Sequence, residues 1–141
     1  MRYYLDTNIL IFLLQLRSDE LSTEVSREIM DYSNLLFTST VCVHELIHLF
    51  QIGKLPLKRN GKDADINEFA QWLSDMGITV NPVSIKHLQE LASLPMFDDH
   101  RDPNDRLIVA QAISDKIPLV SSDRKFERYT KFGLKFLFNK R

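Results

Sequence analysis

The sequence lacks the features that would place a chain in the disulfide-bonded, secreted or membrane-spanning classes. Cys42 is the only cysteine among 141 residues, so no intrachain disulfide can form, which fits a reducing cytoplasm. No apolar run approaches the roughly 20 residues of a membrane span. The run Ile9–Leu16 follows Asp6 and Asn8 and has no small-residue cleavage site, unlike a signal peptide. We therefore expect a soluble, unprocessed, cytoplasmic protein.

A strong net charge is also missing, because the formal charge is only −1 at pH 7. The length of the chain and its 44% hydrophobic residues suit a single domain with one core, over residues 1–141. Basic residues nevertheless gather in Lys58–Lys62 and Arg124–Arg141, which are either solvated surface or a track for a polyanion. Beside an acidic site that binds a metal, the second interpretation is favoured, with Lys58, Arg59, Lys62, Arg124 and Lys125 as candidate contacts to the polyanion.

Short apolar runs alternate with amphipathic segments along the chain, without internal repeats. Strands are predicted at Tyr3–Leu5, Leu35–Thr38, Ile78–Val80, Leu119–Ser121 and Leu134–Phe138. Helices are predicted over Asn8–Leu16, Glu20–Ser33 and Thr40–Ile52, from Ile66 to near Gly77, from Ser84 with Ile85, Leu88 and Leu91 on its apolar face, from Pro103 to about Lys116, and over Arg124–Tyr129. Lys54–Asp63 is predicted to be a polar loop. The alternation predicts an α/β fold, a three-layer α/β/α sandwich around a central, mainly parallel sheet.

Four acidic residues stand where such a fold would gather them. Asp6 follows the first strand, Asp123 follows the fourth, Asp105 starts a helix, and Glu45 lies inside the helix Thr40–Ile52. In an open α/β sheet, ligands bind beyond the carboxyl ends of the strands. Carboxylates that meet there need a cation to stay ionised, and their oxygens suit Mg²⁺ or Mn²⁺. Each acid alone is also compatible with capping a helix or ending a turn, and both roles can hold together.

The segment His44–His48 offers a competing metal site. Its sequence matches the H-E-x-x-H pattern, in which two histidines bind zinc and the glutamate activates water, and Glu68 is a candidate third ligand. On a helix, His44 and His48 share a face, whereas Glu45 points about 100° away from His44. The zinc interpretation leaves the three aspartates unexplained. The carboxylate interpretation is therefore favoured, with an H-E-x-x-H zinc hydrolase as an alternative.

The motifs around the four acids resemble those of the PIN-domain ribonucleases, and in particular the VapC-type toxins of toxin–antitoxin systems. The similar segments are Tyr4–Asn8, Val43–Leu46, His100–Ala112 and Leu119–Asp123, and the resemblance extends from Arg2 to about Phe138. It implies a catalytic, metal-binding tetrad of Asp6, Glu45, Asp105 and Asp123. Asn8 and Ser121 fall at polar positions that support this tetrad, and Asp102 is expected to cap the helix or support the site.

The resemblance also implies an activity and a set of partners. The reaction is hydrolysis of RNA phosphodiester bonds by an endoribonuclease that depends on Mg²⁺ or Mn²⁺ and leaves a 5′-phosphate. The polyanion contacted by Lys58, Arg59, Lys62, Arg124 and Lys125 would then be RNA. A small antitoxin would lay a segment into an apolar groove near the active site, for which Asn8–Leu16 and Glu20–Ser33 supply apolar faces, and the toxin would form a homodimer. Two alternatives stay open: a PIN nuclease of RNA maturation without an antitoxin, and a degenerate binding module.

Overall fold

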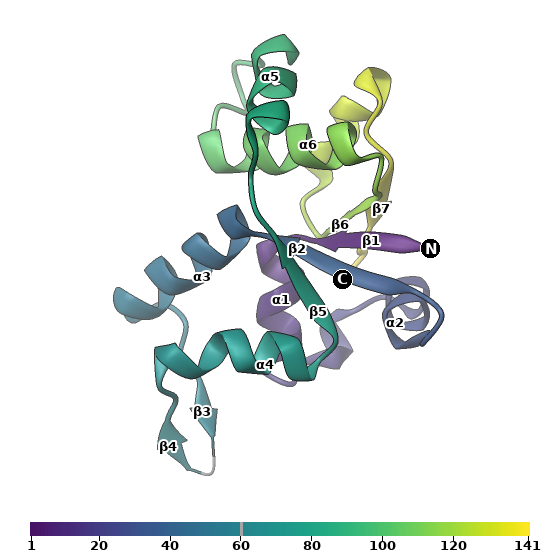
Figure 1. Cartoon of the computed structure of the whole chain (residues 1–141). Coiled ribbons are helices and arrows are strands. Elements are labelled where there is room, and N and C mark those ends of the chain that lie inside the picture. The colour runs from purple at the N-terminus through teal and green to yellow at the C-terminus, as the bar shows by residue number, and fades with distance from the viewer. Residues whose placement is uncertain (60) are drawn as a thin grey trace.

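A five-stranded parallel sheet forms the centre of the computed structural model, which describes residues 1–59 and 61–141 (Figure 1). Its strands are β1 (Arg2–Leu5), β2 (Leu35–Ser39), β5 (Ile78–Asn81), β6 (Leu119–Ser121) and β7 (Phe136–Phe138). Their order is β5-β2-β1-β6-β7, and each neighbouring pair runs parallel. The predicted mainly parallel sheet is thus confirmed.

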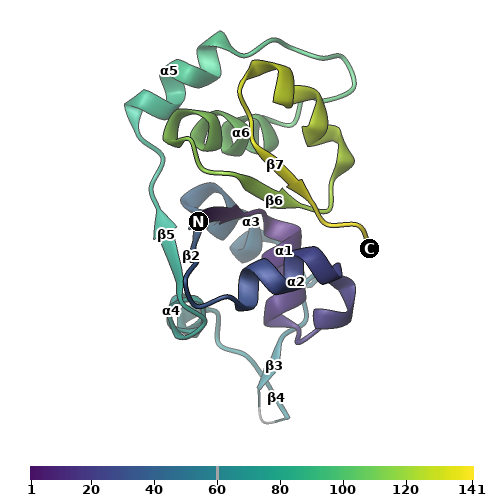
Figure 2. The same cartoon turned by 90° about the vertical axis from the view of Figure 1, so that its right-hand side faces the viewer.

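Helices cover both faces of this sheet. They are α1 (Thr7–Leu14), η1 (Ser18–Glu20), α2 (Thr23–Met30), α3 (Thr40–Gln51), η2 (Ile66–Glu68), α4 (Phe69–Asp75), α5 (Ile85–Ser93), α6 (Pro103–Asp115) and η3 (Arg124–Phe132). In Figures 1 and 2, α5, α6 and η3 lie on one side of the sheet and α1, α2 and α4 on the other. The layers therefore form the predicted α/β/α sandwich.

The local sequence explains how the sheet and helices join at the strand ends. Tyr4 and Leu5 of β1 are completely buried, as expected for a strand covered on both faces. At the end of β2, the Ser39 side chain accepts a hydrogen bond from the Val41 N–H and caps α3, so the strand passes into the helix without a loop. In the same way, β1 passes into α1 through one residue, Asp6. Side chains in the first turns of these helices are thereby held at the carboxyl ends of the strands.

The second helix is shorter than predicted at both ends. The interpretation of Glu20–Ser33 as one helix is wrong, because α2 begins only after Ser22, whose hydroxyl accepts the Val25 N–H. At the other end, the Asp31 side chain accepts hydrogen bonds from the N–H and hydroxyl of Ser33, a turn that competes with helix. Tyr32, beyond the end of α2, is fully exposed.

Two of the three residues predicted on the apolar face of the helix after Ser84 are exposed. Ile85 is 69% exposed and Leu88 is 43% exposed, whereas His87 is buried. The His87 ring bonds Asp115 of α6 through Nε2 at 2.8 Å, and its Nδ1 accepts the N–H of Ser84. These polar contacts turn the His87 side of α5 toward α6, so Ile85 and Leu88 face outward, while Leu91 is partly buried and packs against the core as predicted.

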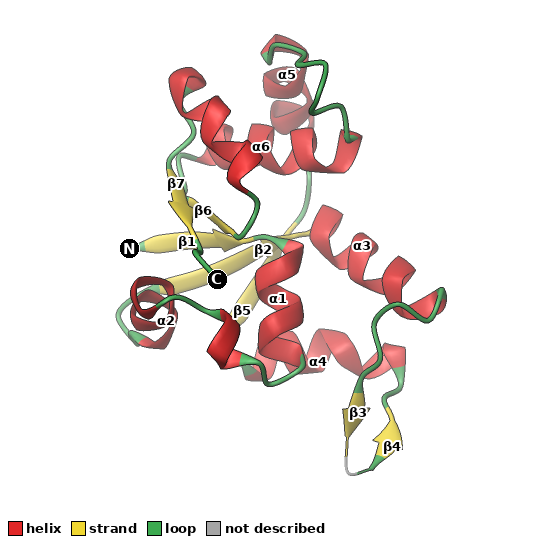
Figure 3. Ribbon diagram, turned by 180° about the vertical axis from the view of Figure 1, so that it is seen from behind, coloured by secondary structure: helices red, strands yellow, loops and turns green. Residues whose placement is uncertain are grey.

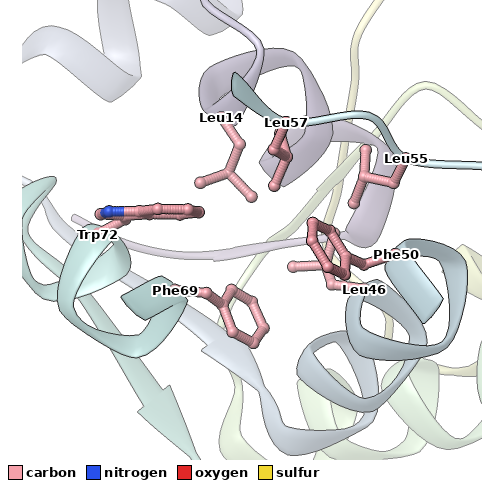
Figure 4. Close-up of a pocket in the computed structure, with 7 residues that line it drawn as sticks. All are labelled: Leu14, Leu46, Phe50, Leu55, Leu57, Phe69 and Trp72. Carbon is pink, nitrogen blue, oxygen red and sulfur yellow. The ribbon is translucent and has the colours of Figure 1, made fainter. Parts of the chain in front are cut away.

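The segment predicted as a polar loop, Lys54–Asp63, contains buried residues and a small hairpin. Within it, β3 (Lys58–Arg59) pairs antiparallel with β4 (Lys62–Asp63), while Asn60 lies outside the described residues. Leu55 and Leu57 of this segment line a small apolar cavity of about 10 Å³ together with side chains of the helices. Figure 4 shows all the lining residues: Leu14, Leu46, Phe50, Leu55, Leu57, Phe69 and Trp72. The segment is therefore anchored through its leucines.

None of the helices in the described chain combines the length and apolar composition that crossing a membrane requires.

Candidate metal centre

Asp6 lies at the carboxyl end of β1, buried between the ends of two strands. Its N–H donates to the Val120 carbonyl of β6, and its Oδ2 accepts the Ser121 hydroxyl at 2.7 Å. The Asn8 amide also approaches Asp6 Oδ2, at 3.4 Å. Although Asp6 occupies the position before α1, its side chain makes no capping hydrogen bond. Its carboxylate is thus held by neighbouring side chains for a purpose other than capping.

Asn8 and Ser121 tie the ends of β1 and β6 together around Asp6. The Asn8 amide donates to the Ser121 hydroxyl oxygen at 3.0 Å, and its carbonyl oxygen accepts the Ser122 N–H at 3.1 Å. The Ser121 hydroxyl oxygen also accepts the Asp123 N–H at 3.1 Å. These contacts fix the direction of the Asp6 carboxylate and the start of the loop that carries Asp123.

Glu45 is presented by α3 and is oriented by the first residue of α1. The Thr7 hydroxyl donates to Glu45 Oε2 at 3.1 Å. Burial raises the pKa of Glu45, and the negative charge of Asp102 adds to this effect. His44 and His48 on the same helix are exposed. Neither lies in a group of three or more potential metal ligands within the described part of the chain, so the geometry gives no support to the H-E-x-x-H zinc interpretation.

Asp102 and Asp105 divide two tasks at the start of α6. Asp102 Oδ1 accepts the N–H groups of Asn104 and Asp105, at 2.8 and 3.3 Å, and therefore caps the helix as expected. Asp105 is left to face the cluster. One ligand atom each of His100, Asp105 and Asp123 lie within 4.8 Å of one another. Asp123 also accepts the Lys125 N–H at 2.9 Å and caps η3, so both roles considered for it are compatible.

The four predicted acids influence one another's ionisation, although Asp6 and Glu45 are not part of the close group that His100, Asp105 and Asp123 form among the described residues. Burial, followed by the charges of Glu45 and Asp123, raises the pKa of Asp6 to about 6. Burial raises the pKa of Asp105 to about 7, assisted by the charges of Asp6, Asp102, Glu45 and Asp123. Carboxylates whose ionisation is opposed in this way favour a divalent cation among them, and oxygen donors suit Mg²⁺ or Mn²⁺. The residues present therefore fit a metal centre.

These raised pKa values predict how the stability of the metal-free protein depends on pH. The folded-state pKa of Asp105 lies above the ordinary aspartate value of 3.8, so its protonation stabilises the folded state below about pH 4. That contribution is lost as pH rises through about 7. Asp105→Asn should therefore raise the free energy of unfolding in EDTA by roughly 2 kcal/mol at pH 8, and by much less at pH 4.

Urea unfolding of the two proteins at both pH values measures this difference. Asp19→Asn, at an exposed position in η1, is the matched control and should show no such pH dependence. An Asp105→Asn protein that is less stable than wild type at pH 8 would contradict the conclusion that burial and the neighbouring negative charges oppose ionisation of Asp105.

Sequence reasoning assigned no role to several side chains that the structure places around the cluster. His100 is buried, with Nδ1 2.6 Å from the Tyr129 hydroxyl oxygen and Nε2 3.3 Å from Asp105 Oδ2. Burial lowers the pKa of His100. Cys42 donates weakly to Asp6 Oδ1 at 3.9 Å, and burial raises its pKa to about 12, so it is a neutral thiol. The only signal for His100 was its place within the His100–Ala112 motif.

The basic residues predicted to contact RNA fall into two separate places. Lys58 and Lys62 belong to the β3–β4 hairpin, which Figures 1 and 3 show projecting from the molecule at the opposite end from α6. Arg124 and Lys125, by contrast, begin η3 directly after Asp123 and are exposed. The Arg124 guanidinium lies over the Phe138 ring, 4.4 Å from its centroid. A role of these residues in RNA binding stays a prediction.

An apolar groove of about 730 Å³ lies beside α1 and α2, as predicted, but away from the acids. Its lining includes Phe12, Leu13 and Leu16 at the end of α1, Ile29, Met30 and Tyr32 at the end of α2, and Leu36 and Ile78 near the amino ends of β2 and β5. Asp6 lies at the other end of α1. With a rise of 1.5 Å per residue, the length of α1 places this groove about 12 Å along the helix from Asp6. Whether an antitoxin segment occupies it stays a prediction.

Comparison with known proteins agrees with this fold. Residues 3–132 match the PIN domain family, and the chain belongs to that family. No curated protein matches the sequence.

Similar solved structures include VapBC2 from Rickettsia felis bound to a DNA fragment from its promoter, with 18% identity, a TM-score of 0.67, and coverage of 99% of this chain and 100% of that chain. DNA-bound VapBC from Salmonella typhimurium has 20% identity, a TM-score of 0.64 and coverage of 98% of both chains. VapBC-1 from nontypeable Haemophilus influenzae has 18% identity, a TM-score of 0.64 and coverage of 98% of both chains. At these identities the likeness shows the fold.

Proposed function

We propose that this protein is a metal-dependent endoribonuclease and the toxin of a type II toxin–antitoxin pair. The single observation that carries the nuclease assignment is the cluster of Asp6, Glu45, Asp105 and Asp123 at the carboxyl ends of β1 and β6 in a PIN domain. The cluster is acidic and partly buried, and Arg124 and Lys125 follow Asp123 directly in the chain, which suits a phosphodiester held through a cation.

The side chains divide the work of such a reaction. Asp6 and Asp105, with Glu45 or Asp123, would hold Mg²⁺ or Mn²⁺. The bound ion would polarise the scissile phosphate and lower the pKa of a water molecule that attacks it. Ser121 and Asn8 keep the Asp6 carboxylate in one orientation, so that no reorganisation is needed when substrate binds. Arg124 and Lys125, beside Asp123, would hold the flanking phosphates without reading sequence.

The partners follow from the fold and the groove. The similar structures are VapBC proteins, and one more is described as a toxin–antitoxin complex from Klebsiella pneumoniae, with 18% identity and a TM-score of 0.56. The groove at the ends of α1 and α2 offers exposed apolar side chains to an amphipathic segment of a small antitoxin. A segment that continued along α1 from this groove would reach the acids. Homodimerisation is part of the same proposal.

A defined cleavage assay tests the nuclease assignment. Purified protein should cut a structured RNA in Mg²⁺ or Mn²⁺, stop in excess EDTA, and leave a 5′-phosphate and a 3′-hydroxyl. The attacking nucleophile is a water molecule and not the 2′-hydroxyl of the ribose. A single 2′-deoxy nucleotide at the cleavage site should therefore leave the rate of cleavage within a few-fold of that of the all-RNA substrate. Products that end in a 2′,3′-cyclic phosphate, or cleavage that continues in EDTA, would refute the mechanism.

A further inference from the structure

His100 stands inside the carboxylate cluster, yet the carboxylate mechanism gives it no task. Its side chain is only 3% exposed. The ring lies 5.6 Å from the Phe126 ring in an edge contact, and 5.4 Å from the Tyr129 ring. The Tyr129 hydroxyl oxygen holds Nδ1 at 2.6 Å. Three contacts thus fix this imidazole in a single orientation.

The other ring nitrogen points at the cluster without a hydrogen bond. His100 Nε2 lies 3.3 Å from Asp105 Oδ2, but the contact is not aligned as a hydrogen bond, and Nε2 has no hydrogen-bond partner within the described chain. A buried polar atom left unsatisfied costs roughly 1–3 kcal/mol. An orphaned nitrogen next to two carboxylates, with all three ligand atoms within 4.8 Å of one another, is the arrangement that a cation would satisfy.

We propose that His100 Nε2 is a direct ligand of the divalent cation, together with one carboxylate oxygen each of Asp105 and Asp123. This assignment rests on the proposed metal requirement and adds a nitrogen donor to the acidic tetrad. It requires the tautomer in which Nδ1–H donates to the Tyr129 hydroxyl oxygen, which leaves the Nε2 lone pair facing the carboxylates. A hydrogen bond from the distal ring nitrogen to a neighbouring group is what orients metal-binding histidines in general.

A nitrogen donor changes which ion the site prefers. Mg²⁺ is a hard ion that takes oxygen ligands in near-ideal octahedral geometry, whereas imidazole suits transition metals. The site should therefore bind Mn²⁺ at least about tenfold more tightly than Mg²⁺. A centre made of carboxylates alone has no nitrogen ligand that would favour Mn²⁺ over Mg²⁺.

Mn²⁺ bound to the metal-free protein provides the test, because its electron spin reports directly bound nitrogen. Pulsed electron paramagnetic resonance should show one coordinated ¹⁴N in the wild type, and competition with Mg²⁺ gives the affinity ratio. His100→Ala should abolish the nitrogen coupling and weaken Mn²⁺ binding by at least about tenfold, with a smaller effect on Mg²⁺. The control His48→Ala, at an exposed position on α3, should change neither quantity.

A second variant keeps the test decisive should His100→Ala fail to fold. Tyr129→Phe removes the hydroxyl that holds Nδ1 but keeps the ring and the imidazole, and it should weaken Mn²⁺ binding by about tenfold. Bound Mn²⁺ without nitrogen coupling in the folded wild type would overturn the proposal, even in a protein that cleaves RNA. Nitrogen-coupled Mn²⁺ in a protein that cleaves no RNA would instead refute the proposed function and leave the His100 assignment standing.

Discussion

Replacing Asp6 with asparagine is expected to lower the rate of RNA cleavage by about a thousandfold while the protein stays folded. Asparagine keeps the shape of the side chain and an oxygen that can accept the Ser121 hydroxyl, so the link between β1 and β6 survives. It removes the negative charge that the cation requires. Since ionisation of the buried Asp6 is already opposed, with its pKa raised to about 6, the neutral side chain should cost little stability.

Single-turnover cleavage of one RNA substrate, with circular dichroism and thermal unfolding as checks, measures this effect. Ser121→Ala keeps the charge of Asp6 but releases its carboxylate, so we expect a smaller loss of about tenfold. Asp19→Asn, at an exposed position, should cleave like the wild type. An Asp6→Asn protein that retains a tenth or more of the wild-type rate would remove Asp6 from the metal centre.

The parts of the fold that were predictable depend on local sequence alone. Tyr3–Leu5 and Leu119–Ser121 are short apolar runs that end in polar residues, and both are buried central strands. Where the prediction failed, competing polar contacts decided the outcome. The Ser22 cap and the Asp31 turn shortened α2, and the bond between His87 and Asp115 chose which side of α5 packs. Hydrophobic periodicity predicts that a helix is amphipathic, but it does not predict a polar contact with another helix that changes which side is buried.

In the candidate site too, local sequence predicts some residues, whereas contacts between distant residues decide the position of others. Asp6 and Asp105 were predictable because a strand end and a helix start place them at a known edge of a parallel sheet. His100 precedes α6 in a loop, and its position depends on a bridge to Phe97 and on the hydroxyl of Tyr129, which is 29 residues away. No local pattern contains that information. The groove was predictable as an apolar face of α1, but its place at the far end of the helix follows from the packing of α2 and β5.

Expression of the wild-type chain alone is expected to arrest bacterial growth, because an unrestrained ribonuclease would destroy an essential RNA. Asp105→Asn should abolish the arrest, since it keeps the polar shape but removes a charge that the cation needs. Where an adjacent gene encodes a small protein, co-expression of that protein should also restore growth, and the two proteins should purify as a complex. Colony counts after induction and pull-down of the complex measure both effects.

A groove variant separates inhibition by the antitoxin from loss of activity. Met30, in the groove, is 59% exposed, so Met30→Glu should leave folding and RNA cleavage intact while a buried charge opposes docking of an apolar segment. Cells that carry this variant should stay arrested even with the antitoxin. Met96→Glu is the matched control, because Met96 is also 59% exposed but lies outside the groove, and its toxicity should still be neutralised. If the wild type proves harmless at high expression yet cuts a precursor RNA in vitro, the toxin role is wrong and a nuclease of RNA maturation takes its place.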